Sequence, residues 1–222
     1  EFKKQNLENI DGLMVGYIEY HLVDIKKSCK ARHPNRWPVL NQAFEAHDQK
    51  KYALSIPVFL AQADGICKDL LGVKFYTRKK GVPATASKAS DLEMDFVSDA
   101  ILEPLRVAGA LNAYEDEIDP SSDVLNRHKV LHGSSLDYQT RLNSFRSISL
   151  VNYLSAAVSG LQQMKQITPE QIEAFNNEAK KSIEEMLKYQ NKNWFSASFD
   201  LGYDMIRNLF QKKPTKSSDK NI

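Results

Sequence analysis

The stretch that decides the fold is "YALSIPVFLAQADGICKDLLG", residues 52–72. Its apolar side chains recur at three- and four-residue steps, which is the period of a helix. Gly72 stands where a helix typically ends, and Pro57 falls within the first turns, where proline is tolerated. The stretch therefore predicts a buried helix over 52–72.

The same helical period continues on both sides of this stretch. Residues 7–25 carry one apolar stripe of a long amphipathic helix, and residues 73–90 lack any period and predict a loop. Further helices are predicted from Pro38 to about Asp48, from Ser90 with a kink near Pro104, from a cap at Ser121 or Ser122 to a stop at Gly133, over 140–164, from Thr168 to about 190, and over 194–211. No strand-like alternation of useful length is present, so we expect an all-α fold: a bundle of four or more helices with peripheral helices.

The length of 222 residues suits one domain with its own hydrophobic core. Apolar residues make up 42% and charged residues 26% of the chain, which is typical of a globular protein. We expect a single all-α domain over 1–212, with a helical extension over about 165–212 and a disordered tail over 213–222.

Charge and cysteine content narrow the function classes. The net charge of +2 is too small to indicate nucleic-acid binding by itself, although basic clusters lie at 26–36 and 78–80 and an acidic run at 115–119. Cys29 and Cys67 are far apart in apolar contexts, which predicts buried thiols of a cytoplasmic protein. No apolar run reaches the length of a membrane span, so no membrane association is expected.

Chemically competent residues gather in "VLNRHKVLHGSS", residues 124–135. Histidine titrates near neutral pH, and the planar arginine fork fits phosphoryl oxygens. On a helix Arg127 and His132 diverge by about 140°, so both can border one groove without stacking. His128 and His132 lie about 40° apart, which also permits a metal-binding pair, but no third ligand is evident.

Several nucleotide and hydrolase motifs are missing from the chain, namely GxxxxGK[ST], GxGxxG and GxSxG. "HKVLH" resembles the zinc motif HExxH in spacing, but Lys129 occupies the position of the glutamate. We therefore predict neither a cofactor nor a metal.

The segment "RHKVLH" resembles the Arg-x4-6-His motif of the HEPN superfamily of metal-independent ribonucleases. The wider segments 36–66 and 125–154 look like those of bacterial HEPN-like proteins, several of them tied to phage defence or toxin systems, so the resemblance covers about 36–160. Many members carry asparagine or aspartate after the arginine, where this chain has His128.

The resemblance implies an endoribonuclease that leaves 2′,3′-cyclic phosphate ends, acting as a toxin or antiviral effector. His132 would act as general acid or base, Arg127 would stabilise the charge of the transition state, and His128 and Asn126 would orient the phosphate or the imidazole. Such a site is completed by a second protomer, so RNA and a homodimer are the expected partners, beside an antitoxin or another domain of a longer protein. The basic clusters would guide the RNA backbone.

Each position also has a structural interpretation. Arg127 can pair with the carboxylates of 115–123, His132 can be a cation favoured by the helix dipole, and His128 can be solvated. Further candidates for the site, each with an alternative role in hydrogen bonding, loops or caps, are Asp64 with Gln62, Tyr138 and Arg141. His21 is expected on an amphipathic helix face and His47 at the surface, and neither is expected to take part in the site. The alternative functions are a non-catalytic module that binds protein, nucleotide or RNA, and a metal site on His128 and His132.

Overall fold

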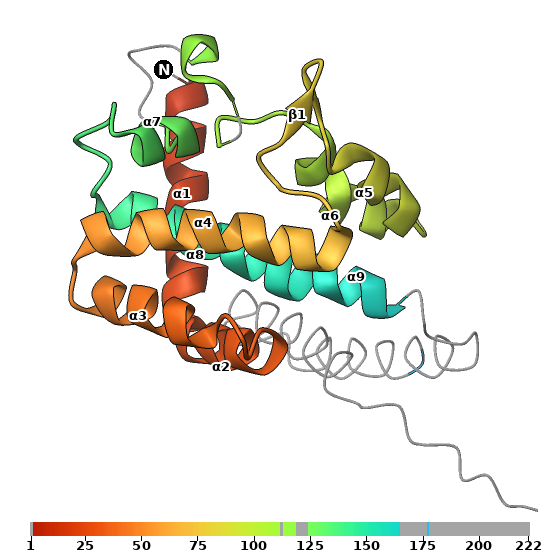
Figure 1. Ribbon diagram of the computed structural model, residues 1–222, viewed down its shortest axis with the longest axis horizontal. Coiled ribbons are helices and arrows are strands. Elements are labelled where there is room, and N and C mark those ends of the chain that lie inside the picture. Colours follow the sequence, from red (N-terminus) through yellow and green to blue (C-terminus); the bar gives the residue numbers. More distant parts are fainter. Residues whose placement is uncertain (1, 112, 119–123, 165–176, 178–222) are drawn as a thin grey trace, which may run out of the picture. The chain divides into compact units, whose positions relative to one another are not determined.

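The computed structural model describes residues 2–111, 113–118, 124–164 and 177 (Figure 1). The chain divides after Ser159 into two compact units, and all features discussed below belong to the first unit. Its elements are α1 (Phe2–Tyr20), α2 (Leu22–Arg32), α3 (Trp37–Asp48), α4 (Tyr52–Leu71), β1 (Arg78–Lys79), β2 (Val82–Pro83), α5 (Ala86–Leu92), α6 (Phe96–Arg106), the 3₁₀ helix η1 (Glu115–Glu117), α7 (Arg127–His132), α8 (Arg141–Asn152) and the π-helical η2 (Tyr153–Val158). The helix α9 (Ser159–Met164) begins at the division, and residues 160–164 and 177 are the described part of the second unit.

The expected all-α class is confirmed, because the described residues are mostly helical. Helix α4, the stretch quoted first, packs against both α3 and α8, and α1 packs against α8 (Figure 1). The core is fully buried at α4 and its neighbours, where the rings of Phe44 and Phe59 meet edge to face at 4.9 Å between centroids. Gly72 ends α4 in the left-handed conformation with φ of 75°, as predicted.

Two predicted helix boundaries are wrong. The helix expected over 7–25 is interrupted at His21, which separates α1 from α2. Ser90 does not start a helix but lies inside α5. The next helix starts after Asp95, whose side chain accepts a hydrogen bond from the Ser98 backbone in a capping box.

The predicted loop over 73–90 contains a small hairpin as well as the first residues of α5. Strands β1 and β2 pair antiparallel through Arg78 with Pro83 and Lys79 with Val82. The two turn residues, Lys80 and Gly81, both have positive φ, of 51° and 80°. This is the backbone that a two-residue hairpin turn needs, and glycine at its second position adopts it without strain.

A polar layer crosses the interior of the bundle between α3, α4 and α8. His47 Nδ1 lies 2.7 Å from Ser144 Oγ, which lies 3.1 Å from Ser55 Oγ. A second pair joins His33 Nε2 to Ser155 Oγ at 3.1 Å. The expectation of a surface position for His47 is therefore wrong, because its side chain packs inside the bundle and is hydrogen bonded there.

Both cysteines are free and buried, as predicted. Burial raises the pKa of Cys29 to about 11 and that of Cys67 to about 12, so neither thiol is a thiolate near neutral pH. The helix expected over 140–164 is confirmed as α8, η2 and α9 in succession, with Thr140 as its cap. Apart from residue 177, the helix expected from Thr168 lies outside the described residues, as do the helix expected over 194–211 and the tail over 213–222.

Candidate functional site

The segment "RHKVLH" forms the short helix α7, which packs against α4. Asn126 caps it, since its Oδ1 accepts a hydrogen bond from the Lys129 backbone at 2.9 Å. Gly133 ends it in the left-handed conformation with φ of 77°, as predicted. The expected start of this helix at Ser121 or Ser122 is wrong: both serines lie outside the described residues, but residues 124–126 are not helical and Asn126 is the cap.

Asn126 is also the anchor of the loop that precedes α7. Its amide nitrogen donates hydrogen bonds to the carbonyl oxygens of Ala110 and Ala113, at 2.7 and 3.0 Å. The side chain is only 2% exposed, and its oxygen and nitrogen are both occupied by backbone partners. The structure thus corrects the predicted role of Asn126, which holds backbone in place instead of orienting a phosphate.

Arg127 is positioned by an aromatic ring. Its guanidinium lies over the ring of Tyr76, 5.4 Å from the centroid, and its Nε is buried with no hydrogen-bond partner among the residues that the structure describes. No carboxylate among the described residues forms an ion pair with it. Glu117 of the acidic run pairs with Arg78 instead. Arg127 therefore retains a positive charge that no described acidic side chain neutralises by direct contact.

Tyr76 connects Arg127 to α4. The backbone N–H of Tyr76 donates to Asp64 Oδ1 at 3.3 Å, and its hydroxyl is buried without a partner. Burial raises the pKa of Tyr76, the Asp64 carboxylate raises it further, and the Arg127 charge opposes both. The structure thus brings Asp64 close to Arg127 through Tyr76. Gln62, which is also on α4, instead accepts a hydrogen bond from Arg36, the residue before α3.

His132 is exposed on α7, whereas His128 is half-buried, as Arg127 is. Their rings are stacked, with centroids 5.6 Å apart and planes 12° from parallel. His128 also contacts the ring of Tyr114 at 5.4 Å. Within one chain no contact joins Arg127 to His132, in keeping with their separation of about 140° around the helix.

Two candidates have structural roles elsewhere in the bundle. Pro57 has no N–H for the carbonyl of Ala53, and the hydroxyl of Tyr138 donates to that oxygen instead, at 3.0 Å. Arg141 forms an ion pair with Glu19 at 2.7 Å on the exposed surface of the bundle. These contacts give Tyr138 and Arg141 structural partners, and their place in the site stays a prediction.

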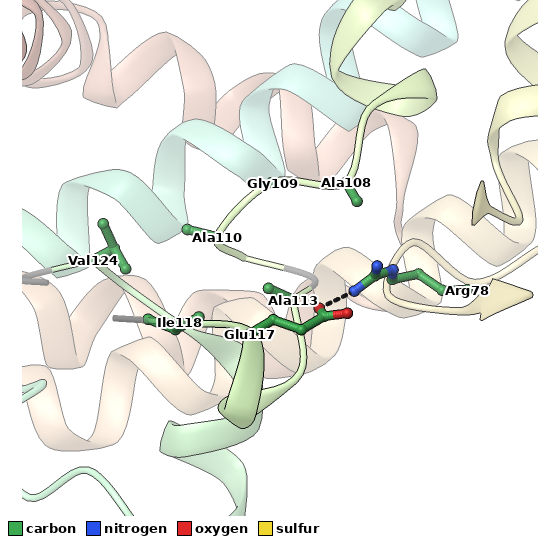
Figure 2. A pocket seen from close by; sticks show the side chains of 8 residues that line it. All are labelled: Arg78, Ala108, Gly109, Ala110, Ala113, Glu117, Ile118 and Val124. Carbon is green, nitrogen blue, oxygen red and sulfur yellow. Dashed lines mark hydrogen bonds and ion pairs between the residues drawn. The ribbon is translucent and has the colours of Figure 1, made fainter. Parts of the chain in front are cut away.

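A pocket of about 370 Å³ opens beside the loop that Asn126 anchors (Figure 2). Backbone and small side chains form much of its wall, and the ion pair of Arg78 and Glu117 crosses one side. The lining residues are Arg78, Ala108, Gly109, Ala110, Ala113, Glu117, Ile118 and Val124. Neither Arg127 nor His132 lines it, and sequence patterns did not indicate it.

Tyr76 and Tyr114 are the site residues that sequence reasoning missed. Both lie in segments without helical period, so no face could be assigned to them. The signal available was the aromatic pair Phe75–Tyr76 directly after the helix stop at Gly72, because a loop seldom buries two rings without a packing partner.

No protein-family model, no curated protein and no solved structure matches this chain. Within the described ranges, no group of three or more histidine, cysteine, aspartate or glutamate side chains is placed to hold a metal ion. Over the same part of the chain, every helix is too short or too polar to cross a membrane.

Proposed function

We propose that the protein is a metal-independent endoribonuclease of the HEPN type, with Arg127 and His132 as its catalytic residues. One observation carries the proposal: α7 begins with an arginine that has no acidic partner among the described residues and ends with an exposed histidine. A guanidinium without a carboxylate partner is available to a phosphate, and an accessible imidazole can exchange protons with substrate.

The proposed reaction is attack of an RNA 2′-hydroxyl on the adjacent phosphorus, with release of the 5′-oxygen and formation of a 2′,3′-cyclic phosphate. His132 takes the proton of the 2′-hydroxyl or supplies one to the leaving 5′-oxygen. Arg127 stabilises the negative charge that grows on the phosphoryl oxygens. The ring of Tyr76 beneath the guanidinium limits the motion of the Arg127 side chain.

A homodimer is part of the proposal. Since Arg127 and His132 do not meet within one chain, one copy supplies the arginine and its symmetry mate the histidine of each site. A two-fold interface places the same patch of both chains face to face and so builds two equivalent sites. A toxin or antiviral role would follow from unrestrained RNA cleavage inside a cell.

The test is cleavage of single-stranded RNA in EDTA by the wild-type protein and by Arg127→Ala and His132→Ala. We expect each variant to lose at least about a hundredfold in rate, which is typical for loss of a general acid or base or of a charge-stabilising group. Arg141→Ala is the matched control, because it removes an arginine whose partner is Glu19. Undiminished cleavage by both alanine variants would refute the assignment.

Mixing the two inactive variants tests the shared site. In a dimer of one Arg127→Ala chain and one His132→Ala chain, one of the two sites retains both residues. Random exchange should therefore restore about a quarter of the wild-type activity. Without restoration in exchanged dimers, the arginine and histidine of a site come from the same chain.

A non-catalytic binding module is the second candidate, and the separate surroundings of Arg127 and His132 in one chain favour it. In that case the surface around α7 would bind a protein, a nucleotide or RNA. RNA binding without cyclic-phosphate products, unchanged by His132→Ala, would select this function over the first.

A further inference from the structure

Four flat or cationic side chains form a continuous row from the pocket to α7. The guanidinium of Arg78 lies over the ring of Tyr114 at 5.2 Å, Tyr114 lies 5.4 Å from His128, and His128 is stacked on His132 at 5.6 Å. We call Arg78, Tyr114, His128 and His132 the stacking row. It joins β1, the segment before η1 and α7, and it ends on the proposed catalytic histidine.

The pocket and the stacking row share Arg78, and the same contacts hold both in place. Glu117 Oε2 accepts from the Tyr114 backbone at 2.9 Å and also pairs with Arg78 (Figure 2). The α7 cap, Asn126, binds the carbonyls of Ala110 and Ala113, two residues of the pocket wall. The distance from pocket to α7 is therefore set by a network of hydrogen bonds.

The chemistry of this region suits a base better than a phosphate. Arg78 is already neutralised by Glu117, so the pocket offers no free cation to an anion. Its walls combine polar backbone and charged groups with alanine, glycine, isoleucine and valine side chains, so they offer a flat ring both hydrogen-bond partners and apolar contact. The carboxylate can accept from an exocyclic amino group, and a guanidinium can donate to ring nitrogen or carbonyl acceptors. The side chain of Tyr114 is 47% exposed and can stack on a second ring.

We propose that the pocket and Tyr114 bind an unpaired base of single-stranded RNA and so place the neighbouring phosphate at His132. The inference rests on the proposed function and adds the place where the protein holds a base of its substrate. Duplex RNA does not fit this site, because its bases are stacked and paired and cannot enter a pocket lined by an ion pair and small residues. The row of rings gives base stacking without strong dependence on sequence, while Glu117 favours bases that carry an amino group.

The experiment measures binding of a fluorescent single-stranded RNA oligonucleotide to the full chain in EDTA, with His132→Ala as the background that prevents cleavage. We expect Tyr114→Ala to weaken binding about 5- to 100-fold, the loss typical of one stacked base, and Tyr114→Phe to retain it. Tyr20→Ala is the matched control, since Tyr20 is 72% exposed on α1 and should leave affinity unchanged. Ala113→Leu narrows the pocket and should weaken binding without loss of helical circular dichroism.

Three results would overturn the inference. Equal affinity of the Tyr114→Ala and Tyr20→Ala proteins would remove the stacking role. If a matched RNA duplex binds as tightly as the single strand, the site does not require an unpaired base. Binding of free mononucleotides with no affinity for the oligonucleotide would assign the pocket to a small nucleotide. The proposed function fails separately, because its failure shows as binding that depends on Tyr114 with no cleavage by the wild-type protein.

Discussion

The histidines of the bundle are buried, whereas those of α7 are half-buried at His128 and exposed at His132. His47 and His33 lie inside the bundle, and each shares a hydrogen bond with a buried serine hydroxyl. Burial lowers the pKa of both rings, which keeps them neutral at physiological pH. His128 and His132 stack on each other near the surface, on a helix of six residues.

This difference separates structural from available histidines. A buried imidazole that is hydrogen bonded and neutral can neither reach a substrate nor gain a proton without cost to the fold. An accessible imidazole next to another ring can do both, and its loss costs the fold little. The comparison therefore supports α7 as the location of the proposed proton transfer, and it can be tested with variants of both groups of histidines.

The largest expected effect is on stability. We expect His47→Ala to lower the free energy of unfolding by about 2–4 kcal/mol, because it leaves a cavity and removes the partner of the Ser144 hydroxyl. His132→Ala should change it by about 0.5 kcal/mol or less. Urea unfolding followed by circular dichroism measures both values. Equal losses in the two variants would contradict the distinction between structural and available histidines.

The next effect concerns the support under α7. Asn126→Ala removes a helix cap and two hydrogen bonds to backbone carbonyls, so we expect a loss of about 2 kcal/mol. Asn126→Ser keeps a cap acceptor but not the amide donor, and should lose about half as much. The urea midpoints of the two variants give the values. If Ser proves no better than Ala, the cap does not contribute to stability.

The pH dependence of stability should come from the bundle histidines. Their pKa in the folded state lies below the ordinary value of 6.5, so the unfolded chain binds protons first as the pH falls. Stability is therefore full above about pH 6.5 and declines below it, until the folded state also takes up the protons. Each group contributes at most about 1.4 kcal/mol per pH unit.

Urea midpoints between pH 7.5 and 5.5 measure this decline. His47→Gln should flatten it, because one of the buried titrating groups is removed. An unchanged slope in this variant would show that His47 does not cause the decline.

The helices of the bundle could be predicted because their signals are local. The period of 52–72, the stop at Gly72 and the stop at Gly133 each depend on neighbouring residues, and all three are found as expected. The position of His47 also had a local signal, since Leu40, Ala43 and Phe44 precede it on the buried face of α3. The polar residues after it obscured that face.

The site could be predicted only in part, because its geometry depends on contacts between distant segments. The chemistry of arginine and histidine indicated Arg127 and His132 as candidates, and helix geometry predicted that they point in different directions around the helix. The ring beneath Arg127 comes from Tyr76, about fifty residues earlier in a loop without period. The role of Tyr138 likewise depends on a carbonyl that Pro57 leaves unpaired in another helix. Such partners follow from the three-dimensional fold and not from spacing.

The smallest expected effect concerns the stack of His128 on His132. Residues four apart on a helix interact by a few tenths of a kcal/mol, so a double-mutant cycle with alanine at both positions should give a coupling of about 0.2–0.5 kcal/mol at pH 8. The same cycle on the cleavage rate should give a much larger coupling, because His128 then positions the ring that transfers the proton. If the coupling in rate does not exceed the coupling in stability, the stack is a feature of the fold alone and His132 acts without help from its neighbour.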